Sequence, residues 1–134
     1  MGTTKESGRG VKCRAGDTWT ESRYFQFIRS ALRAAWNKYP VKGQVLRAAR
    51  RSTTVSKTKK HRFEYRCAVC DKNYIGSQVQ VDHINPCGSL KTYEDLPRFV
   101  ATLFCEADNL QVICTTCHND KTQAEREAKK NARD

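Results

Sequence analysis

An acidic side chain and an imidazole stand side by side in the segment QVQVDHINP, as Asp82 and His83. A carboxylate oxygen coordinates hard divalent cations, and a neutral imidazole accepts a proton from water near pH 7. Asn109 and His118 follow in DNLQVICTTCHND and can join the same site if the two segments meet. Each residue alone has a plainer explanation: His83 as a hydrogen-bonded core histidine, Asn109 as a turn residue, His118 as a helix-capping donor. Together they indicate acid–base chemistry beside a bound metal ion.

Two C-x-x-C pairs flank this region, Cys67 with Cys70 and Cys114 with Cys117, with 43 residues between them. Each pair suits a tight turn that directs two thiolates at one ion, so the two pairs predict a closed, structural four-cysteine zinc site. A thioredoxin-like redox pair fits less well, since that motif uses one pair in a βαβ setting. The C-x-x-C-H sequence also matches haem attachment, which a second pair disfavours. Three other cysteines match no ligand pattern: Cys13, Cys87 and Cys105.

Strands and one helix must position these groups. QVQVDHI alternates in polarity and predicts a strand that reaches His83, and NPCGS is turn chemistry. Adjacent strand residues point to opposite faces, so Asp82 and His83 converge on His118 only if the strand ends within a residue or two of Ile84. ADNLQVI leads into the second cysteine pair, and Thr115 to about Lys130 predicts a polar helix. Lys121 on that helix is expected to lie in solvent or at a phosphate backbone.

The N-terminal half is predicted to be helical after a flexible tail at residues 1–16. Thr18 and Glu21 resemble a capping box, and Pro40 should end the helix. VKGQVLRAARRS predicts a second, shorter helix, and LKTYEDLPRFVATLF predicts another beyond the Asp-His pair. The core stripe expected on the first helix repeats at helical spacing: Tyr24, Ile28, Ala31, Ala35 and Tyr39, broadened by Phe27, Leu32 and Trp36.

Charge is distributed unevenly between the two halves of the 134-residue chain. The net charge is +11, yet residues 1–66 hold 17 Lys and Arg against four Asp and Glu, whereas residues 67–134 hold eight against ten. Such a basic half is the electrostatic footprint of a nucleic-acid-binding protein. The sequence shows neither a secretory signal nor a membrane-spanning run, so we expect a soluble, intracellular protein. The expected phosphate contacts are Arg47, Arg50, Arg51, Lys57, Lys59, Lys60 and Arg62.

The combination CAVC, VQVDHINP and DNLQVICTTCHNDKT resembles the HNH nucleases, whose fold is the ββα-metal (His-Me finger) fold. The resemblance is close over residues 61 to about 126, and about four-fifths of the chain is similar to small free-standing HNH nucleases of tailed phages. It implies an α+β fold in three parts. Residues 1–16 form a flexible basic tail, residues 17–60 form a basic helical arm and linker that contacts DNA, and residues 61–134 form the nuclease domain.

The resemblance also implies a mechanism. His83 is the general base, Asp82 and His118 hold one Mg²⁺ or Mn²⁺, and Asn109 either orients the His83 loop or joins the metal shell. One structural Zn²⁺ per chain occupies the four cysteines. The expected activity is cleavage or nicking of double-stranded DNA to 5′-phosphate and 3′-hydroxyl ends, in the cytoplasm of a bacterial host. The role is homing, genome packaging or exclusion of a competing phage, with a homodimer or phage packaging proteins as further partners. The alternative is a zinc-stabilised DNA-binding protein without catalysis.

Overall fold

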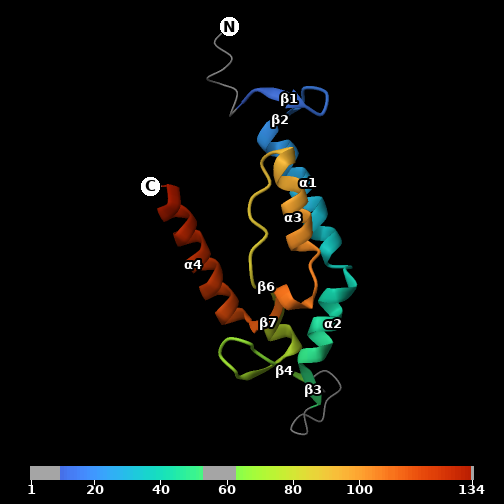
Figure 1. The fold of residues 1–134 in the computed structure, drawn as a ribbon, viewed down its shortest axis with the longest axis vertical. Helices are drawn as coiled ribbons and strands as arrows, with labels where there is room; N and C mark the ends of the chain where they lie inside the picture. The colour runs from blue at the N-terminus through green and yellow to red at the C-terminus, as the bar shows by residue number, and fades with distance from the viewer. Residues whose placement is uncertain (1–9, 53–62, 134) are drawn as a thin grey trace. The chain divides into compact units, whose positions relative to one another are not determined.

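The computed structural model describes residues 10–52 and 63–133 of a mixed α+β chain with small antiparallel sheets (Figure 1). The chain forms two compact units. Unit 1 combines Met1–Tyr39 with Asn85–Phe104, and unit 2 combines Pro40–Ile84 with Cys105–Asp134. The segment 85–104, expected within the nuclease domain, therefore belongs to the unit of the first helix. The expected boundary near residue 60 lies among residues that the structure does not describe.

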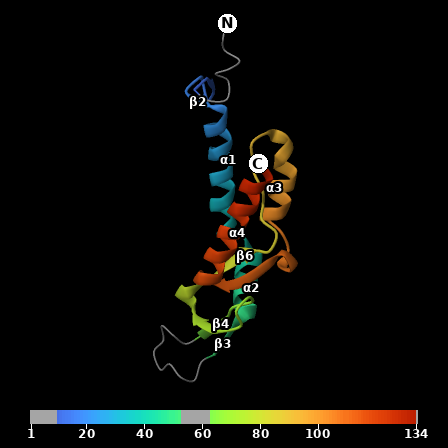
Figure 2. The same cartoon turned by 90° about the vertical axis from the view of Figure 1, so that its left-hand side faces the viewer.

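Unit 1 begins with a short hairpin of β1 (Lys12–Arg14) and β2 (Trp19–Thr20), and β2 continues into α1 (Glu21–Trp36) (Figure 2). The expected flexible tail is therefore too long at its C-terminal end, because Lys12–Arg14 pairs with β2. The returning segment adds the 3₁₀ turn η4 (Tyr93–Asp95) and α3 (Leu96–Leu103). The helix predicted over LKTYEDLPRFVATLF is thus confirmed, although its regular part is shorter.

The cap of α1 lies two residues later than the sequence suggested. Thr20 is the N-cap, and its hydroxyl accepts a hydrogen bond from the Arg23 N–H at 3.1 Å. The Thr18 hydroxyl instead donates to the Ala15 carbonyl at 2.6 Å, inside the hairpin turn. Pro40 does not end α1, which stops at Trp36. It opens α2 (Pro40–Ala49), because proline is well suited to the first turn of a helix.

The helical period of α1 is confirmed, but the stripe that it buries differs from the predicted one. Phe25 is only 2% exposed and packs with Cys87, Leu90, Phe99 and Leu103, while Tyr24, Ile28, Leu32 and Trp36 pack around this cluster. Ala31, Ala35 and Phe27 were expected in the core and are exposed. The reason is the position of the returning segment, since α3 packs against α1 on the side of Phe25.

Phe99 supplies the first test of this core. Its side chain is fully buried, so Phe99→Ala should lower the free energy of unfolding of unit 1 by about 3–5 kcal/mol. Both tryptophans of the chain, Trp19 and Trp36, lie in unit 1, so tryptophan fluorescence during urea unfolding reports on this unit. The matched control is Phe27→Ala, which removes a side chain that is 57% exposed and should cost only about 0.5–1.5 kcal/mol, through its contact with the Trp19 ring. Equal losses would contradict the assigned core.

Unit 2 contains two small sheets. β3 (Arg50–Ser52), β4 (Phe63–Arg66) and β5 (Asn73–Ile75) form one antiparallel sheet in the order β3-β4-β5. After the 3₁₀ turn η3 (Gly76–Gln78), β6 (Val79–His83) pairs antiparallel with β7 (Leu110–Cys114), which follows the 3₁₀ turn η5 (Ala107–Asn109). The helix α2 lies against both β6 and β7.

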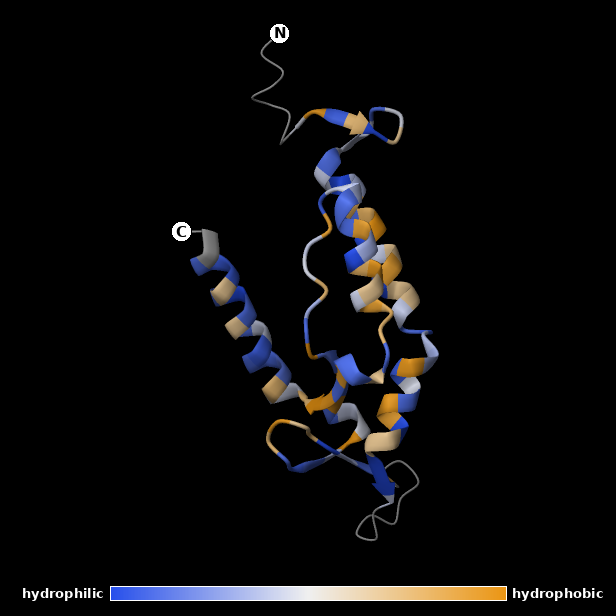
Figure 3. Cartoon of the chain, viewed as in Figure 1, coloured by the Kyte–Doolittle hydropathy of each residue, from blue (hydrophilic) through white to orange (hydrophobic). Residues whose placement is uncertain are grey.

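The strand β6 ends at His83, as the sequence predicted. The polar helix α4 (Thr115–Arg133) follows β7 without a loop (Figure 1). Figure 3 shows α4 as mostly hydrophilic along its length, consistent with a helix that buries only a narrow side. Among the described residues, no helix is both long and apolar enough to cross a membrane.

Candidate functional site

Four cysteines gather at one place in unit 2. Cys67 directly follows β4, Cys70 closes the next turn, Cys114 ends β7 and Cys117 lies in the first turn of α4. Their sulfur atoms all lie within 4.8 Å of one another, and the sulfurs of Cys70 and Cys114 are 4.0 Å apart. Four thiolates around one tetrahedral Zn²⁺ stand about 3.8 Å apart, given Zn–S bonds of about 2.3 Å. The predicted cluster is confirmed as a group that can hold a metal ion, and it is consistent with one structural Zn²⁺.

Backbone N–H groups surround the cysteine sulfurs. Cys67 accepts three such hydrogen bonds, from Val69 and Cys70 at 3.4 Å and from Cys114 at 3.3 Å. Burial raises the pKa of the Cys67 thiol, but these donors outweigh that effect and lower the pKa to about 6. The Cys117 N–H, 3.4 Å from the Cys114 sulfur, lowers the pKa of that thiol as well. These donors therefore favour the thiolate, the form in which cysteine binds metal, at Cys67 and Cys114, whereas the hydrogen bond to the Cys114 side chain raises the pKa of Cys117 to about 12.

Side chains brace the turn between Cys67 and Cys70. The Tyr74 hydroxyl lies 3.2 Å from the Cys70 sulfur, and this hydrogen bond raises the pKa of Tyr74. Arg66 forms a two-point ion pair with Asp71, at 2.6 and 2.5 Å. Asp71 has a φ of +67°, a left-handed conformation that aspartate tolerates better than most residues. The turn thus holds the cysteine pair through contacts that do not require the metal itself.

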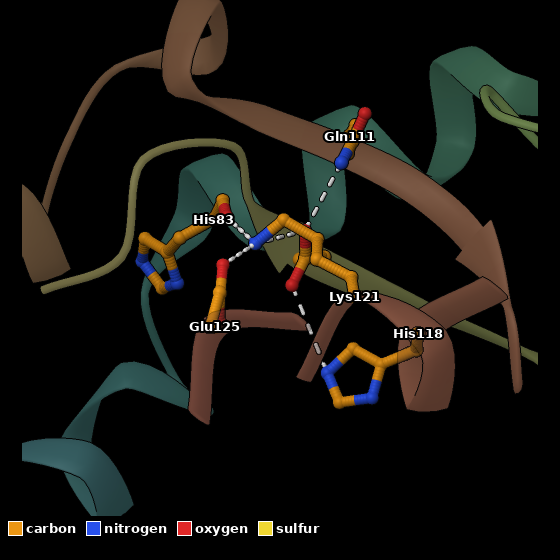
Figure 4. Close-up of polar contacts among 6 residues, drawn as sticks. His83, Gln111, His118, Lys121 and Glu125 are labelled. Carbon is orange, nitrogen blue, oxygen red and sulfur yellow. Dashed lines mark hydrogen bonds and ion pairs between the residues drawn. The ribbon is translucent and has the colours of Figure 1, made fainter. Parts of the chain in front are cut away.

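A polar cluster forms where β6 and β7 meet α4 (Figure 4). Asp82 is only 8% exposed and stands opposite Gln111 in the strand register, so the two side chains share one face of the sheet. The Gln111 amide donates to Asp82 Oδ2 at 3.0 Å. His118 Nε2 lies 3.7 Å from Asp82 Oδ1, beyond normal hydrogen-bond length. The strand carboxylate and the helix imidazole predicted to meet are therefore brought together.

Lys121 supplies the positive charge beside Asp82. Its ammonium group is 3.3 Å from Asp82 Oδ2, donates to the His83 carbonyl oxygen at 3.0 Å, and pairs with Glu125 one helical turn further on. Partial burial lowers the pKa of Lys121, but the hydrogen bond to Glu125 and the charge of Asp82 outweigh it, so the pKa is raised. Lys121 was expected in solvent or at a phosphate backbone, and the structure instead turns it inward.

His83 is also 8% exposed, but its ring does not accompany Asp82 toward His118. In Figure 4 the rings of His83 and His118 lie on opposite sides of the Lys121 ammonium group. This follows from strand geometry, because neighbouring residues alternate in direction and His83 is still the last residue of β6. Asn109 meets the strand end through its carbonyl oxygen, which accepts from the Ile84 N–H at 2.8 Å.

The cysteine cluster and the Asp82–His118 pair differ in the number of metal ligands that they offer. Within residues 10–52 and 63–133, the four cysteines are the one group of three or more His, Cys, Asp or Glu side chains close enough to share an ion. Asp82 and His118 contribute two donors, so a cation between them needs water or substrate for its remaining ligands. Mg²⁺ commonly binds in this way, through one or two protein groups.

The predicted phosphate contacts are only partly described. Arg47 lies on α2 as expected, whereas Arg50 and Arg51 lie on β3. As neighbours on a strand they point to opposite faces, so they cannot both serve one phosphate surface. The Arg50 guanidinium lies 4.1 Å from the Phe63 ring centroid, and Arg51 is 3.9 Å from Glu64. The other candidates fall outside the described residues: Lys57, Lys59, Lys60 and Arg62.

The sequence patterns did not predict that Gln111, Lys121 and Glu125 gather around Asp82. Gln111 interrupts an apolar strand, which is a usable signal, but its pairing with Asp82 depends on a register that spacing alone does not give. Glu125 follows Lys121 by four residues, the spacing of a helical ion pair. Nothing in the sequence indicated that this pair faces β6.

The remaining cysteines are not members of the cluster: Cys13 is exposed on β1, Cys87 is buried in unit 1, and Cys105 is half-buried.

Comparisons of the chain with family models, with curated proteins and with solved structures find no match.

Proposed function

We propose that the protein is a metal-dependent DNA endonuclease or nickase with a ββα-metal core. The observation that carries the proposal is the meeting of Asp82 and His118 beside the end of β6, with 3.7 Å between Oδ1 and Nε2. The order of β6, β7 and α4 agrees with the HNH resemblance, and the four-cysteine cluster joins β4, β7 and α4 around this point. The basic N-terminal half supports a nucleic-acid substrate.

The donor atoms fit a divalent cation. Two ligands of one Mg²⁺ are at most about 4.2 Å apart, since each bond is about 2.1 Å, and Asp82 Oδ1 and His118 Nε2 meet that limit. Gln111 and Lys121 hold the other Asp82 oxygen and so fix the direction of Oδ1. A Mg²⁺ or Mn²⁺ ion held by this pair supplies charge neutralisation at the scissile phosphate and the leaving oxygen.

The residues of the chain perform the remaining tasks in this proposal. The His83 imidazole accepts the proton of the attacking water, and to reach the Asp82–His118 pair its ring must turn from the opposite side of the Lys121 ammonium group, where Figure 4 shows it. Lys121 holds the His83 carbonyl and the Asn109 carbonyl holds the Ile84 N–H, so two hydrogen bonds fix the strand end that carries His83. Asn109 thus acts as a positioning residue through its backbone.

Metal dependence is the direct test of the function. Supercoiled plasmid should be converted to open circles when Mg²⁺ or Mn²⁺ is added to protein that retains its zinc, and conversion should be at background without either ion. Gel electrophoresis gives the rate, and atomic emission gives the zinc content of the same sample.

A control must separate the effect of the structural zinc from the effect of the added Mg²⁺ or Mn²⁺. EDTA alone is ambiguous, because chelation that removes a structural zinc unfolds the site as well. The metal-free state should therefore be reached by desalting, and activity should return on adding Mg²⁺ with no added zinc. Nicking that persists without added metal, or that never appears with Mg²⁺ or Mn²⁺ at full zinc content, would contradict the proposal.

The second candidate is a zinc-stabilised DNA-binding protein without catalysis. It is favoured by the contacts of Asp82, whose buried carboxylate already has Lys121 and Gln111 as partners. In that case the polar cluster only joins α4 to β6. DNA binding without nicking, by protein with full zinc content, would support this candidate.

A further inference from the structure

Two aromatic side chains and an arginine form an outward-facing group at the start of α1 in unit 1. The Trp19 and Phe27 rings have centroids 5.0 Å apart and planes inclined at 56°. The Arg23 guanidinium lies 5.0 Å from the Trp19 ring centroid. Phe27 is 57% exposed, one of the most exposed large apolar side chains among the described residues. We name these three residues the aromatic platform.

The platform lies away from the core of unit 1. Phe27 follows Phe25 by two residues, and two helical steps turn the side chain through about 200°. Phe25 is buried against α3, so Phe27 faces the opposite way, on the same side of the helix as Arg23. The strand β2 continues directly into α1 (Figure 2), which sets Trp19 beside these residues. The platform is thus built from a strand end and the first turns of one helix.

The net charge of the segment that carries the platform favours an anionic partner. Residues 10–39 carry six basic side chains, Lys12, Arg14, Arg23, Arg29, Arg33 and Lys38, against two acidic ones, Asp17 and Glu21. Glu21 is already paired with Arg14 at 2.8 Å. In the described part of the chain, Arg23 forms no ion pair, and its guanidinium lies over the Trp19 ring. An apolar surface for another protein segment would not need this uncompensated charge.

We propose that the aromatic platform binds unpaired bases of a nucleic-acid strand, with Trp19 and Phe27 stacking on bases and Arg23 beside the phosphates. Every base offers a flat face to an aromatic ring, whereas bases inside a duplex already stack on one another. Positive charge next to exposed aromatic rings is the arrangement that single-strand binders use. The inference is independent of the proposed hydrolysis, because it concerns residues of unit 1 and binding alone.

The experiment measures binding of the full chain, without added divalent metal, to three fluorescein-labelled DNA probes. They are a 12-nucleotide oligothymidylate, the same backbone with abasic sites in place of thymines, and a 20-base-pair duplex. The wild type should prefer oligothymidylate to the abasic strand. Phe27→Ala should weaken oligothymidylate binding by about 5- to 150-fold, the range of one base stack, and leave binding to the abasic strand unchanged. Phe27→Tyr keeps a ring and should retain the wild-type affinity.

Matched variants separate stacking from charge and from folding. Arg33→Ala removes a charge elsewhere on α1 and should weaken all three probes alike. Gln123→Ala changes an exposed side chain of α4 in unit 2 and should change none. In a Trp36→Phe background, the fluorescence of Trp19 should be quenched by oligothymidylate. Equal affinity for the abasic strand, no effect of Phe27→Ala, or a Phe27-dependent dimer in sedimentation would overturn the proposal.

Discussion

Cys67→Ser should reduce bound zinc from about one ion per chain to below about 0.1, measured by atomic emission after gel filtration. Cys67 is fully buried, its pKa is lowered to about 6, and its sulfur is one of the four in the cluster. Structural zinc contributes roughly 10–16 kcal/mol of apparent binding free energy in small domains, comparable with the whole stability of a domain. Unit 2 should therefore lose much of its helical circular dichroism and become sensitive to protease.

Two further variants show whether the loss of metal is what destabilises unit 2 in Cys67→Ser. Cys67→Val has an apolar side chain of similar size, so a cysteine that merely filled space would tolerate it, whereas a zinc ligand would not. Cys13→Ser changes an exposed thiol of unit 1 and should leave the zinc content unchanged. Full zinc content in Cys67→Ser, or a stable and zinc-free Cys67→Val protein, would refute the structural role of the metal.

His83→Ala should lower plasmid nicking by about 10²- to 10⁴-fold at saturating Mg²⁺, the usual contribution of a general base. The side chain is buried at the end of β6, but its removal leaves the cysteine cluster and the Asp82–His118 pair in place. Zinc content and DNA affinity, measured on the same preparation, should match the wild type. A rate near that of the wild type would remove His83 from the proposed chemistry.

Asp82→Asn provides the contrast that separates base from metal ligand. The amide keeps the size of the carboxylate but loses the charge that faces His118 and Lys121. We expect it to raise the Mg²⁺ concentration needed for half-maximal nicking, whereas His83→Ala should lower the rate without moving that concentration. The same metal dependence in both variants would mean that the two residues do not have the separate roles proposed here.

Local patterns predicted a good part of the fold. The alternation in QVQVDHI gave a strand and the Asn-Pro turn gave its end, because both signals are contained in a few residues. The cysteine pairs gave a metal cluster across 43 intervening residues, because thiol chemistry leaves few alternatives for such spacing. The polar helix after the second pair was also predicted, from helical periodicity in a local stretch of sequence.

The predictions that differ from the structure are those that depend on contacts between segments far apart in the sequence. Phe27 and Phe25 look equally suitable for burial, and only the approach of α3 decides between them. Likewise, the polar helix that carries Lys121 is typical of a solvated helix, and the packing of α4 against β6 turns Lys121 toward Asp82. Helical period and charge pattern therefore identified the four helices of the described residues but not the face that each one buries.

The interleaving of the two units has a consequence for synthesis on the ribosome. Unit 1 is complete in sequence once Phe104 has been made, whereas unit 2 still lacks β7, which supplies the partner strand of β6. Cys67 and Cys70 then exist without the other cysteine pair until Cys117 emerges. A chain growing at about 5–20 residues per second makes residues 71–117 in a few seconds. Asp82 and His83 thus emerge long before their partners, and unit 2 can close only after unit 1 has all of its residues.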